Sequence, residues 1–236
     1  KLGLDVITCV VKGGYHSKPR WATGKRRNRK IELDYKLEIS KADLERLTPE
    51  EIGSIVKKAL YHNDYEYQRQ VMVPHPGKRL AEGLENIVYI CPHCESVNTI
   101  ETYRNTIRCT ACKHEGHIDK YGFIKGFVFD NLIDWDNFQR KFQDKLRQST
   151  IKSKGVLSFL RMEDESQTKV GEIELLYCDG EFRLSGARSE MIPIQEIENP
   201  TVTLRRDLGF KYSEQHYIIR LEHYNAAFLR ILQDKY

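Results

Sequence analysis

The sequence predicts an α+β chain built of several parts, and three observations lead to this expectation. Two Cys-x-x-Cys pairs near the middle of the chain predict a small ribbon held by a metal ion. The segment before them contains two strand patterns, at residues 5–11 and 31–39, and one helix pattern at 49–60. Residues 154–236 contain short strand-like stretches followed by a single helical stretch, which predicts a small antiparallel β domain closed by a C-terminal helix.

Composition sets broad limits on the class of protein. The 236 residues are enough for one large domain or two to three small ones, and 40% hydrophobic with 31% charged residues is ordinary for a globular protein. No apolar stretch approaches the ~20 residues of a membrane-spanning helix. We therefore expect no part of the chain to cross a bilayer, while association with a bilayer surface stays open.

Four parts are expected along the chain. In order they are residues 1–75, a ribbon over 86–125, a linker helix over 130–148, and the small β domain over 154–236. Within the linker, Asp134 is the expected N-cap of a helix over 135–147, and residues 149–154 are expected to connect it to the β domain.

The first part should contain two strands and a well-defined helix. Residues 5–11 are almost all apolar and predict a buried strand, whereas 31–39 alternate apolar and polar, which predicts a strand with one buried face. The helix over 49–60 is expected because Thr48 can cap it and a glutamate three residues later can reach back to the cap amide. Because the chain opens directly on a strand, we expect it to be the back part of a longer protein.

The cysteine pairs predict one structural zinc ion per chain. Each pair, Cys91 with Cys94 and Cys109 with Cys112, places two thiolates on one tight turn, and two such turns complete a tetrahedron of sulfurs. A hairpin between the pairs should bring the two turns together. Zinc would then contribute folding free energy that so small a core lacks.

Neighbouring residues refine this prediction. Many such turns carry glycine after the second cysteine, but Glu95 and Lys113 stand there, which predicts strained backbone. His93, His114 and His117 are alternative ligands close by. Because four cysteines already fill a tetrahedral shell, the histidines are left out of the predicted site.

The remaining cysteines, Cys9 and Cys178, lie in apolar strand-like surroundings and are expected to be small core residues. Paired metal ligands with free thiols are typical of a reducing compartment, so a cytoplasmic location is expected.

The C-terminal part shows regularly spaced short strands. A strong hairpin signal stands at Asp179-Gly180, and Tyr224, Phe228, Ile231 and Leu232 share one helical face. This pattern resembles the pleckstrin-homology or GRAM class, which implies docking to a lipid or a protein. The expected strands are Val156–Met162, Glu172–Cys178, Glu181–Leu184, Met191–Ile197, Thr201–Arg205 and His216–Leu221.

Several segments resemble a known enzyme family. They are Asp5-Val6-Ile7-Thr8-Cys9-Val10-Val11-Lys12-Gly13-Gly14-Tyr15, Lys18-Pro19-Arg20-Trp21-Ala22, Tyr61-His62-Asn63-Asp64-Tyr65-Glu66-Tyr67-Gln68 and Leu80-Ala81-Glu82-Gly83-Leu84-Glu85-Asn86. Together with the ribbon, over roughly residues 1–145, they resemble glycerol-3-phosphate and 1-acylglycerol-3-phosphate acyltransferases, in a bacterial branch where a ribbon follows the acyltransferase domain. Residues 1–75 would then be the C-terminal end of that α/β domain.

The resemblance implies a role in phospholipid synthesis. The family transfers an acyl group from acyl-CoA or an acyl carrier to lysophosphatidic acid or a related lysolipid, at the membrane. A His-(four residues)-Asp motif supplies the general base, and a Glu-Gly-Thr-Arg-like segment grips the phosphate. Both motifs precede the segments that are matched here. The literal match from His114 to Asp119 follows the second cysteine pair directly, so we do not expect it to be catalytic, and we expect this chain alone to be inactive.

Cations near the first matched segment are the expected lipid or phosphate contacts. This set comprises Lys18, Arg20, Trp21, Lys25, Arg26, Arg27, Arg29 and Lys30. Facing anionic headgroups, they would hold the protein at the inner face of the membrane. The alternative is a zinc-ribbon module without enzymatic activity that binds nucleic acid or docks a protein. Nucleic acid is the less expected partner, because 34 acidic residues nearly balance 38 basic ones.

Overall fold

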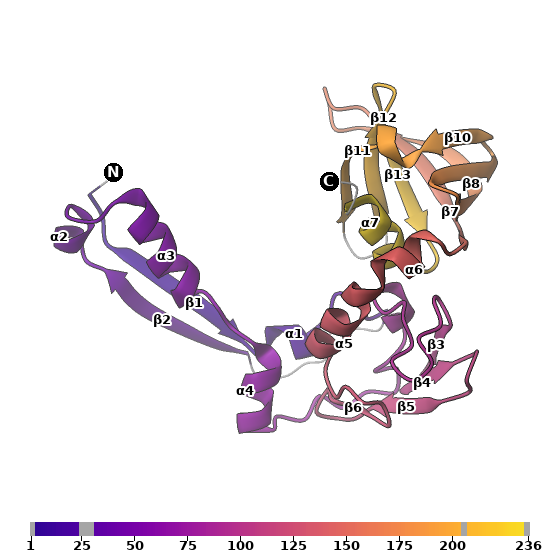
Figure 1. The fold of residues 1–236 in the computed structure, drawn as a ribbon. Coiled ribbons are helices and arrows are strands. Elements are labelled where there is room, and N and C mark those ends of the chain that lie inside the picture. The colour runs from indigo at the N-terminus through magenta and orange to yellow at the C-terminus, as the bar shows by residue number, and fades with distance from the viewer. Residues whose placement is uncertain (1–2, 24–30, 204–206, 234–236) are drawn as a thin grey trace. The chain divides into compact units, whose positions relative to one another are not determined.

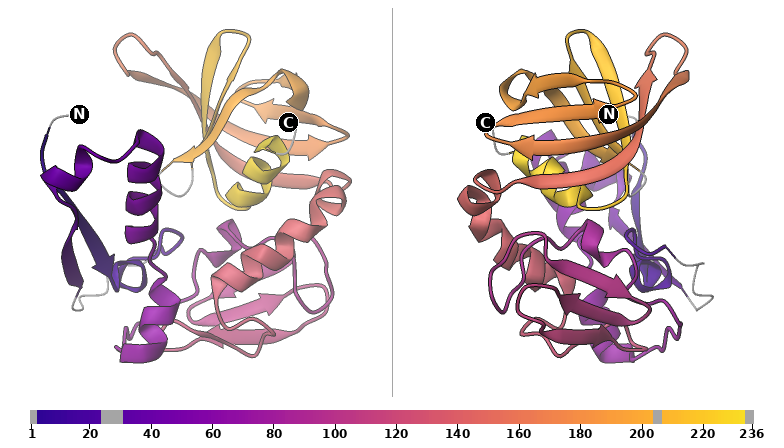
Figure 2. Two further views of the ribbon diagram at one scale, coloured as in Figure 1. Left: turned by 60° about the vertical axis from the view of Figure 1, so that its left-hand side comes forward. Right: turned by 90° about the vertical axis from the view of Figure 1, so that its right-hand side faces the viewer.

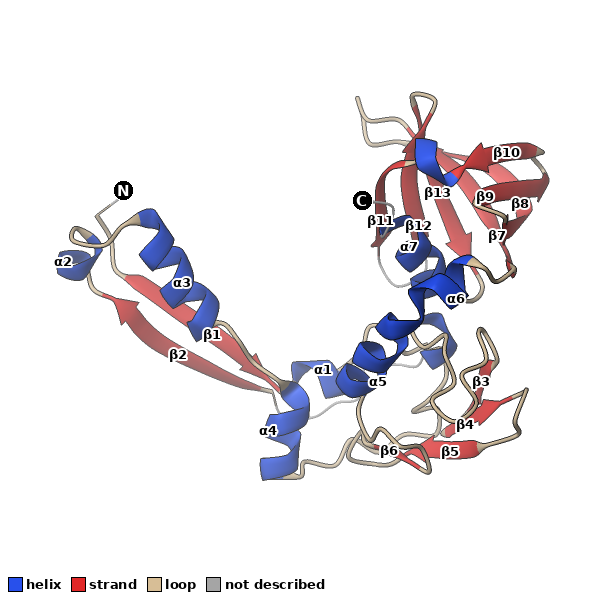
Figure 3. Ribbon diagram, viewed as in Figure 1, coloured by secondary structure: helices blue, strands red, loops and turns tan. Residues whose placement is uncertain are grey.

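The computed structural model describes residues 3–23, 31–203 and 207–233, and it divides into two compact units (Figure 1). The described residues within 1–19, 25–77 and 120–122 form unit 1. Those within 20–24, 78–119 and 123–236 form unit 2. Both units mix helices with antiparallel strands, so the α+β expectation is confirmed (Figure 3).

Unit 1 is a two-stranded antiparallel sheet with four helices. Its elements are β1 (Val6–Lys12), α1 (Gly14–Ser17), β2 (Glu32–Ile39), α2 (Lys41–Leu44), α3 (Pro49–Ala59) and α4 (Asp64–Val71). The register places Ile7 opposite Leu37 and Val11 opposite Leu33. Helix α3 lies along the two strands and packs against β2 (Figure 1).

The start of α3 confirms the predicted cap. The Thr48 hydroxyl accepts a hydrogen bond from the Glu51 backbone N–H at 3.2 Å, and the Glu51 carboxylate accepts one from the Thr48 N–H at 2.8 Å. Pro49 occupies the first helical position, where its missing N–H costs nothing. This reciprocal arrangement satisfies two backbone donors that a helix terminus otherwise leaves to water.

The prediction that the apolar sides of strands β1 and β2 are buried is wrong. Exposed fractions are 64% for Ile7, 47% for Val11, 52% for Leu33, 67% for Tyr35 and 55% for Leu37. The other side is the covered one, since Thr8 is 5% exposed. We call the side formed by Ile7, Cys9, Val11, Leu33, Tyr35 and Leu37 the apolar face.

Unit 2 begins with a ribbon. A 3₁₀ turn, η1 (Leu84–Asn86), precedes four antiparallel strands in chain order: β3 (Ile100–Tyr103), β4 (Thr106–Cys109), β5 (Glu115–Ile118) and β6 (Ile124–Lys125). The hairpin between the cysteine pairs is therefore confirmed, with Arg104 in its turn at φ 53°.

The linker helix begins earlier than predicted and is interrupted. It consists of α5 (Leu132–Gln139), the 3₁₀ turn η2 (Arg140–Phe142) and α6 (Gln143–Arg147). Asn131, not Asp134, is the N-cap: its side-chain oxygen accepts hydrogen bonds from the N–H groups of Ile133 and Asp134, both at 3.0 Å. Asn131, three residues upstream of Asp134, outcompetes it as the cap because its side-chain carbonyl reaches both of these donors.

A curled seven-stranded antiparallel sheet follows (Figure 2). Its strands are β7 (Ile151–Leu160), β8 (Gln167–Cys178), β9 (Glu181–Gly186), β10 (Glu190–Pro193), β11 (Glu198–Thr203), β12 (Asp207–Tyr212) and β13 (Gln215–Leu221), with a 3₁₀ turn, η3 (Ile194–Glu196), after β10. Their order in the sheet is β10-β9-β8-β7-β13-β12-β11. The chain ends in α7 (Asn225–Gln233).

The inward side chains of this sheet form one core with α7. Phe182, Phe228 and Tyr217 are at most 1% exposed, and Phe228 on α7 packs edge-on against Phe182 at 5.8 Å between ring centroids. Tyr89 and Ile90, which precede the first cysteine pair, belong to the same core. The ribbon and the sheet therefore share buried side chains.

For the C-terminal part, one predicted boundary is wrong, one strand was not predicted, and one hairpin is confirmed. The expected connector at 149–154 is largely strand, because β7 starts at Ile151, and β12 was not predicted. The hairpin at Asp179-Gly180 is confirmed: both residues have positive φ, 52° and 79°, which matches the twist of the flanking strands.

Candidate metal centre

Helix α5 fixes the segment that leads into the first cysteine pair. The Gln139 amide nitrogen donates to the Ile87 carbonyl and its oxygen accepts from the Tyr89 N–H, both at 3.0 Å. The Trp135 indole N–H donates to the Ile90 carbonyl at 2.9 Å. These side chains form hydrogen bonds with the backbone of residues 87–90, much as a neighbouring strand would. Because Cys91 follows directly, buried groups fix its position.

The two cysteine turns have the same backbone hydrogen bonds. The N–H of Cys91 donates to the carbonyl of Ser96, and the N–H of Glu95 donates back to Cys91. Cys109 repeats both bonds with the residues at the corresponding positions, His114 and Lys113. Glu95 and Lys113 have φ of 58° and 65°, so the predicted strain after each second cysteine is confirmed.

The four thiols converge on one point. Sγ of Cys91 lies 3.9 Å from Sγ of Cys112, and Sγ of Cys94 lies 3.7 Å from Sγ of Cys109. All four sulfurs lie within 4.8 Å of one another. A tetrahedral ion with metal–sulfur bonds of about 2.3 Å requires sulfurs about 3.8 Å apart. The cluster can therefore hold a metal ion.

The thiols differ in how readily they ionise. Burial raises the pKa of the Cys91 thiol to about 12, so a thiolate there at neutral pH requires a nearby cation. Burial also opposes ionisation of Cys94, but hydrogen bonds with the Ser96 side chain and backbone outweigh it and lower the pKa of that thiol to about 6.

Two hydroxyl groups in contact with the sulfurs were not predicted. Ser96 Oγ lies 3.3 Å from Sγ of Cys94, and Thr99 Oγ1 lies 3.2 Å from Sγ of Cys109. Burial opposes ionisation of Cys109 as well, but hydrogen bonds from the Cys112 backbone and the Thr99 hydroxyl lower its pKa. Such groups orient metal-bound thiolates. Ser96 stands two residues after Cys94, and this closeness is the signal that would have found it, whereas Thr99 lies ten residues before Cys109 and only the hairpin brings it there.

The nearby histidines lie outside the thiol cluster. The rings of His93 and His114 stack at 4.6 Å between centroids, and Nε2 of His114 lies 2.5 Å from the Gly126 carbonyl oxygen. His114 and Asp119 flank β5 at opposite ends, and its extended backbone separates their Cα atoms by roughly 16 Å. This geometry does not suit a catalytic pair.

The predicted lipid contacts are described only in part. Lys18 and Arg20 are exposed, whereas Trp21 is 5% exposed, which leaves little of its indole for a headgroup. The five cations from Lys25 to Lys30 lie outside the described residues. In the described ranges no helix is long and apolar enough to span a bilayer. Cys9 and Cys178 are partly exposed, so the expectation that they are core residues is wrong.

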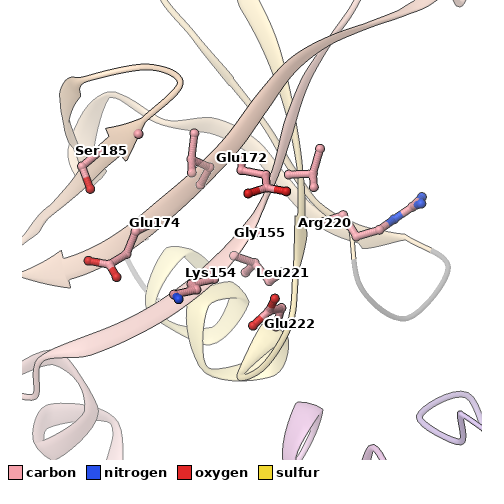
Figure 4. A pocket seen from close by; sticks show the side chains of 11 residues that line it. Lys154, Gly155, Glu172, Glu174, Ser185, Arg220, Leu221 and Glu222 are labelled. Atoms are coloured by element: carbon pink, nitrogen blue, oxygen red, sulfur yellow. The ribbon is translucent and has the colours of Figure 1, made fainter.

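A depression lies on the outer side of β7, β8 and β13 in unit 2 (Figure 4). Glu172, Glu174, Glu222, Lys154 and Arg220 contribute its charged side chains. Two of these charges already have partners. Glu174 pairs with a lysine on β7 at 2.9 Å, and Arg220 binds a carboxylate on β12 through two nitrogens at 2.8 and 3.0 Å. Its mixed charge indicates no particular ligand.

Comparison with protein-family models, curated proteins and solved structures found no match.

Proposed function

We propose that this chain is a non-catalytic accessory region of a phospholipid-synthesis acyltransferase, folded around one structural zinc ion. The observation that carries the proposal is a set of contacts within the chain. Segments that resemble the acyltransferase family are separated in sequence, but they contact one another through the residues that carry the resemblance.

Asp64 joins two of these segments within unit 1. Its carboxylate accepts hydrogen bonds from the N–H groups of Gly13 and Tyr15, at 2.8 and 2.6 Å, and so caps α1. The next residue, Tyr65, packs its ring against Tyr15 at 5.7 Å and against His16 at 4.9 Å. The matched residues thus act as structural contacts.

Trp21 and Gly83 join two further segments within unit 2. Gly83 has φ of +94°, and a Cβ at this position would lie 2.2 Å from the Trp21 carbonyl oxygen. Only glycine allows this approach. Residues in the segments that resemble the family therefore have defined structural roles in this chain.

Zinc is the metal that suits the site best. Four thiolates are soft ligands, and tetrahedral sulfur coordination is typical of structural Zn²⁺ or of iron. All four positions of the tetrahedron would be filled by protein, which favours a structural ion over a catalytic one. The ion would hold Cys91, Cys94, Cys109 and Cys112 as thiolates and so join the two turns.

The C-terminal sheet supports docking rather than catalysis. Numbered from its own first strand, its order is 4-3-2-1-7-6-5 with a helix after the last strand, which resembles a pleckstrin-homology domain. Because β7 pairs with β13, the β7–β8 and β12–β13 turns lie at one end of the sheet. Exposed acids gather on these turns: Glu163, Asp164, Glu165 and Glu214. This charge favours a protein over a phosphate headgroup as the ligand of that end.

We assign contact with lipid headgroups to the basic segment and not to the C-terminal sheet. Lys18, Arg20 and the cations from Lys25 to Lys30 would attract anionic headgroups, at about 1 kcal/mol for each cation near the surface. Co-sedimentation with phosphatidylglycerol vesicles at low salt tests this. Lys18→Glu combined with Arg20→Glu should weaken binding, whereas Lys58→Glu on α3 should not. Binding that is insensitive to salt and to the double substitution would contradict the assignment.

Acyl transfer itself is the test of the function. The complete product of the native gene should transfer an acyl group from acyl-CoA to lysophosphatidic acid, while the 236-residue chain should show no transfer above background. Zinc analysis should give one equivalent in both. A complete product that folds and binds zinc but transfers nothing, to this or related lysolipids, would remove the acyltransferase proposal and leave a protein-docking module.

A further inference from the structure

The four sulfurs of the metal centre differ in how far solvent reaches them. Cys91 and Cys109, the first cysteine of each pair, are fully buried, whereas Cys94 and Cys112 are partly exposed. Oxidation of a thiolate depends on its access to solvent and on its nucleophilicity. An oxidant in solution therefore reaches the sulfurs of Cys94 and Cys112 first.

Hydrogen bonds distinguish the two exposed sulfurs. The Ser96 hydroxyl lies 3.3 Å from Sγ of Cys94, and the Ser96 backbone N–H donates to the same sulfur. Sγ of Cys112 receives its hydrogen bond from the His114 backbone, and no hydroxyl group of a described residue contacts it. A hydrogen bond that stabilises a thiolate lowers its nucleophilicity. Cys112 is therefore the more reactive of the two exposed sulfurs.

The two buried sulfurs differ in the same way. The Thr99 hydroxyl lies 3.2 Å from Sγ of Cys109, whereas in the part of the chain that the structure describes no hydroxyl contacts Sγ of Cys91. Sγ of Cys91 is also the sulfur for which a separation of 3.9 Å from Sγ of Cys112 is found, across the two turns. The two sulfurs without a hydroxyl partner are therefore neighbours, one exposed and one buried.

We propose that Cys112 is a site of oxidation by hydroperoxides, and that Cys91 then forms a disulfide with it and so releases the metal ion. This inference rests on the zinc ion of the proposed function and is independent of acyl transfer. The metal centre then responds to the redox state of its surroundings, through one defined pair of its four thiolates.

The reaction balances with a hydroperoxide as the oxidant. The Cys112 thiolate attacks the terminal peroxide oxygen, the O–O bond breaks, and the sulfur gains a hydroxyl group while the leaving oxygen takes up a proton. The Cys91 thiolate then attacks the Cys112 sulfur, the S–S bond forms, and hydroxide leaves and takes up a second proton. Two electrons pass from the sulfurs to the peroxide. Because two thiolates are consumed, only two sulfur ligands remain and the ion dissociates.

The movement that this disulfide requires falls on the second cysteine turn. The two sulfurs must approach from 3.9 Å to about 2.0 Å. Cys91 is held in place, because the preceding residue, Ile90, is buried in the core of the C-terminal sheet and its carbonyl accepts the Trp135 indole N–H at 2.9 Å. Cys112 is partly exposed and follows strand β4, so its turn can shift toward Cys91.

Zinc release with disulfide mapping tests the inference. The sample is the zinc-loaded 236-residue chain that carries Cys9→Ser and Cys178→Ser, which removes the two thiols outside the cluster. Hydrogen peroxide is added below one equivalent, released zinc is read with a coloured chelator, and mass spectrometry of a non-reduced digest locates the disulfide. Released zinc should equal the amount of disulfide between Cys91 and Cys112. A sulfenic-acid trap that is present during the reaction should label Cys112.

Other outcomes separate the inference from the proposed function. A first disulfide between any other two cysteines overturns the inference and leaves the zinc site in place. Zinc that stays bound at a peroxide dose that oxidises Cys178 of the unsubstituted chain overturns it as well. A chain that binds no zinc before peroxide is added contradicts the proposed metal and the inference together.

A matched pair of variants tests the role of the hydroxyl group beside Cys94. Ser96→Ala removes this group, so zinc release should accelerate by up to about tenfold, and a disulfide from Cys94 to Cys109, 3.7 Å away, should appear. Thr106→Val removes an exposed hydroxyl of strand β4 that contacts no sulfur, and its rate should equal that of the parent chain. Equal rates and the same disulfide in both variants would overturn the argument that hydrogen bonds direct the oxidation to Cys112.

Discussion

At the scale of single residues, the backbone after each cysteine pair is held in a conformation that suits glycine. Glu95 and Lys113 have positive φ because each donates its N–H to the first cysteine of its turn. For a residue with a Cβ, the left-handed conformation costs about 1 kcal/mol or more. Their side chains are not needed for this geometry.

We therefore expect Glu95→Gly and Lys113→Gly each to raise the free energy of unfolding by about 1 kcal/mol, less the entropy that glycine adds to the unfolded chain. Chemical denaturation of the zinc-loaded protein measures this. Glu115→Gly in strand β5 is the control and should lower stability, because glycine weakens a strand interior. Equal losses at all three positions would contradict the strain argument.

Removing one thiol should remove the ion. Cys94→Ser leaves three sulfurs, and we expect bound zinc to fall from one equivalent to a small fraction of it, with loss of the ribbon fold. Elemental analysis after gel filtration measures the metal. Cys178→Ser, which lies on β8 outside the cluster, should keep its full equivalent. Full zinc retention by Cys94→Ser would show that the ligand set is different.

At the scale of elements, one carboxylate connects the β10 strand to β13. Glu190 accepts two hydrogen bonds from Arg188, at 2.6 and 3.0 Å, and one from the Tyr217 hydroxyl at 2.9 Å. The hydrogen bonds from Arg188 are the main cause that holds the pKa of Glu190 below its ordinary value. The hydrogen bond from Tyr217 adds to this effect, and burial opposes it. Burial and then the Glu190 carboxylate raise the pKa of Tyr217 to about 12.

This pKa shift predicts a dependence of stability on pH. Because the folded pKa of Glu190 is depressed, its contribution is present above the ordinary glutamate pKa of 4.5 and is lost as pH falls through the folded value. Glu190→Gln should lower stability at pH 7 by about 1 kcal/mol and reduce the further loss on acidification. Thermal melts between neutral and acidic pH measure both. An unchanged acid dependence in Glu190→Gln would exclude this carboxylate as a source.

Elements with an explicit local signal were predictable, and those defined by distant contacts were not. Thr48 and Pro49 predicted the start of α3 because a capping box is a local interaction. Helix α4 is an exception, since it was missed although Asn63 caps it locally by accepting hydrogen bonds from the N–H groups of Tyr65 and Glu66. Strand β12 was missed as well. It contains Gly209, which weakens a strand pattern, and it gains its place from pairing with β13.

At the scale of the whole molecule, the metal centre and the C-terminal sheet share a core within unit 2. Tyr89 and Ile90 are buried among the sheet residues, and the next residue, Cys91, belongs to the four-thiol cluster. Loss of the ion should therefore weaken the sheet as well as the ribbon.

We expect a chelator with a reductant to lower the melting temperature of unit 2 by several degrees, at about 2–4 °C for each kcal/mol lost. Calorimetry measures this, and added Zn²⁺ should restore the original value whereas Mg²⁺ should not, because Mg²⁺ prefers oxygen ligands. A sheet that melts at the same temperature with and without the ion would show that the shared core transmits no stability.

The four-cysteine cluster was predictable from the sequence, whereas the hydroxyl groups of Ser96 and Thr99 beside it and the surroundings of unit 1 were not. Four cysteines at fixed spacing define a site by themselves, so Cys91 and Cys112 needed no structural information. The alternation of apolar and polar residues in β2 correctly predicted a strand, but the expectation that its apolar side is buried was wrong. Periodicity shows that a side is apolar, and only the neighbouring elements decide whether it is covered.

The side chains of Trp135 and Gln139 reach back over more than forty residues to hold the backbone just before Cys91. The number of residues between these hydrogen-bonded backbone groups and Cys91 therefore cannot change without displacing the Cys91 thiol. One residue inserted between Ile90 and Cys91 would turn the first thiolate away from the other three, while several residues added at the exposed turn around Asp164 would lengthen a surface loop and little else. Homologous chains that keep the metal should vary freely in length at that turn and not at all between Tyr89 and Cys91.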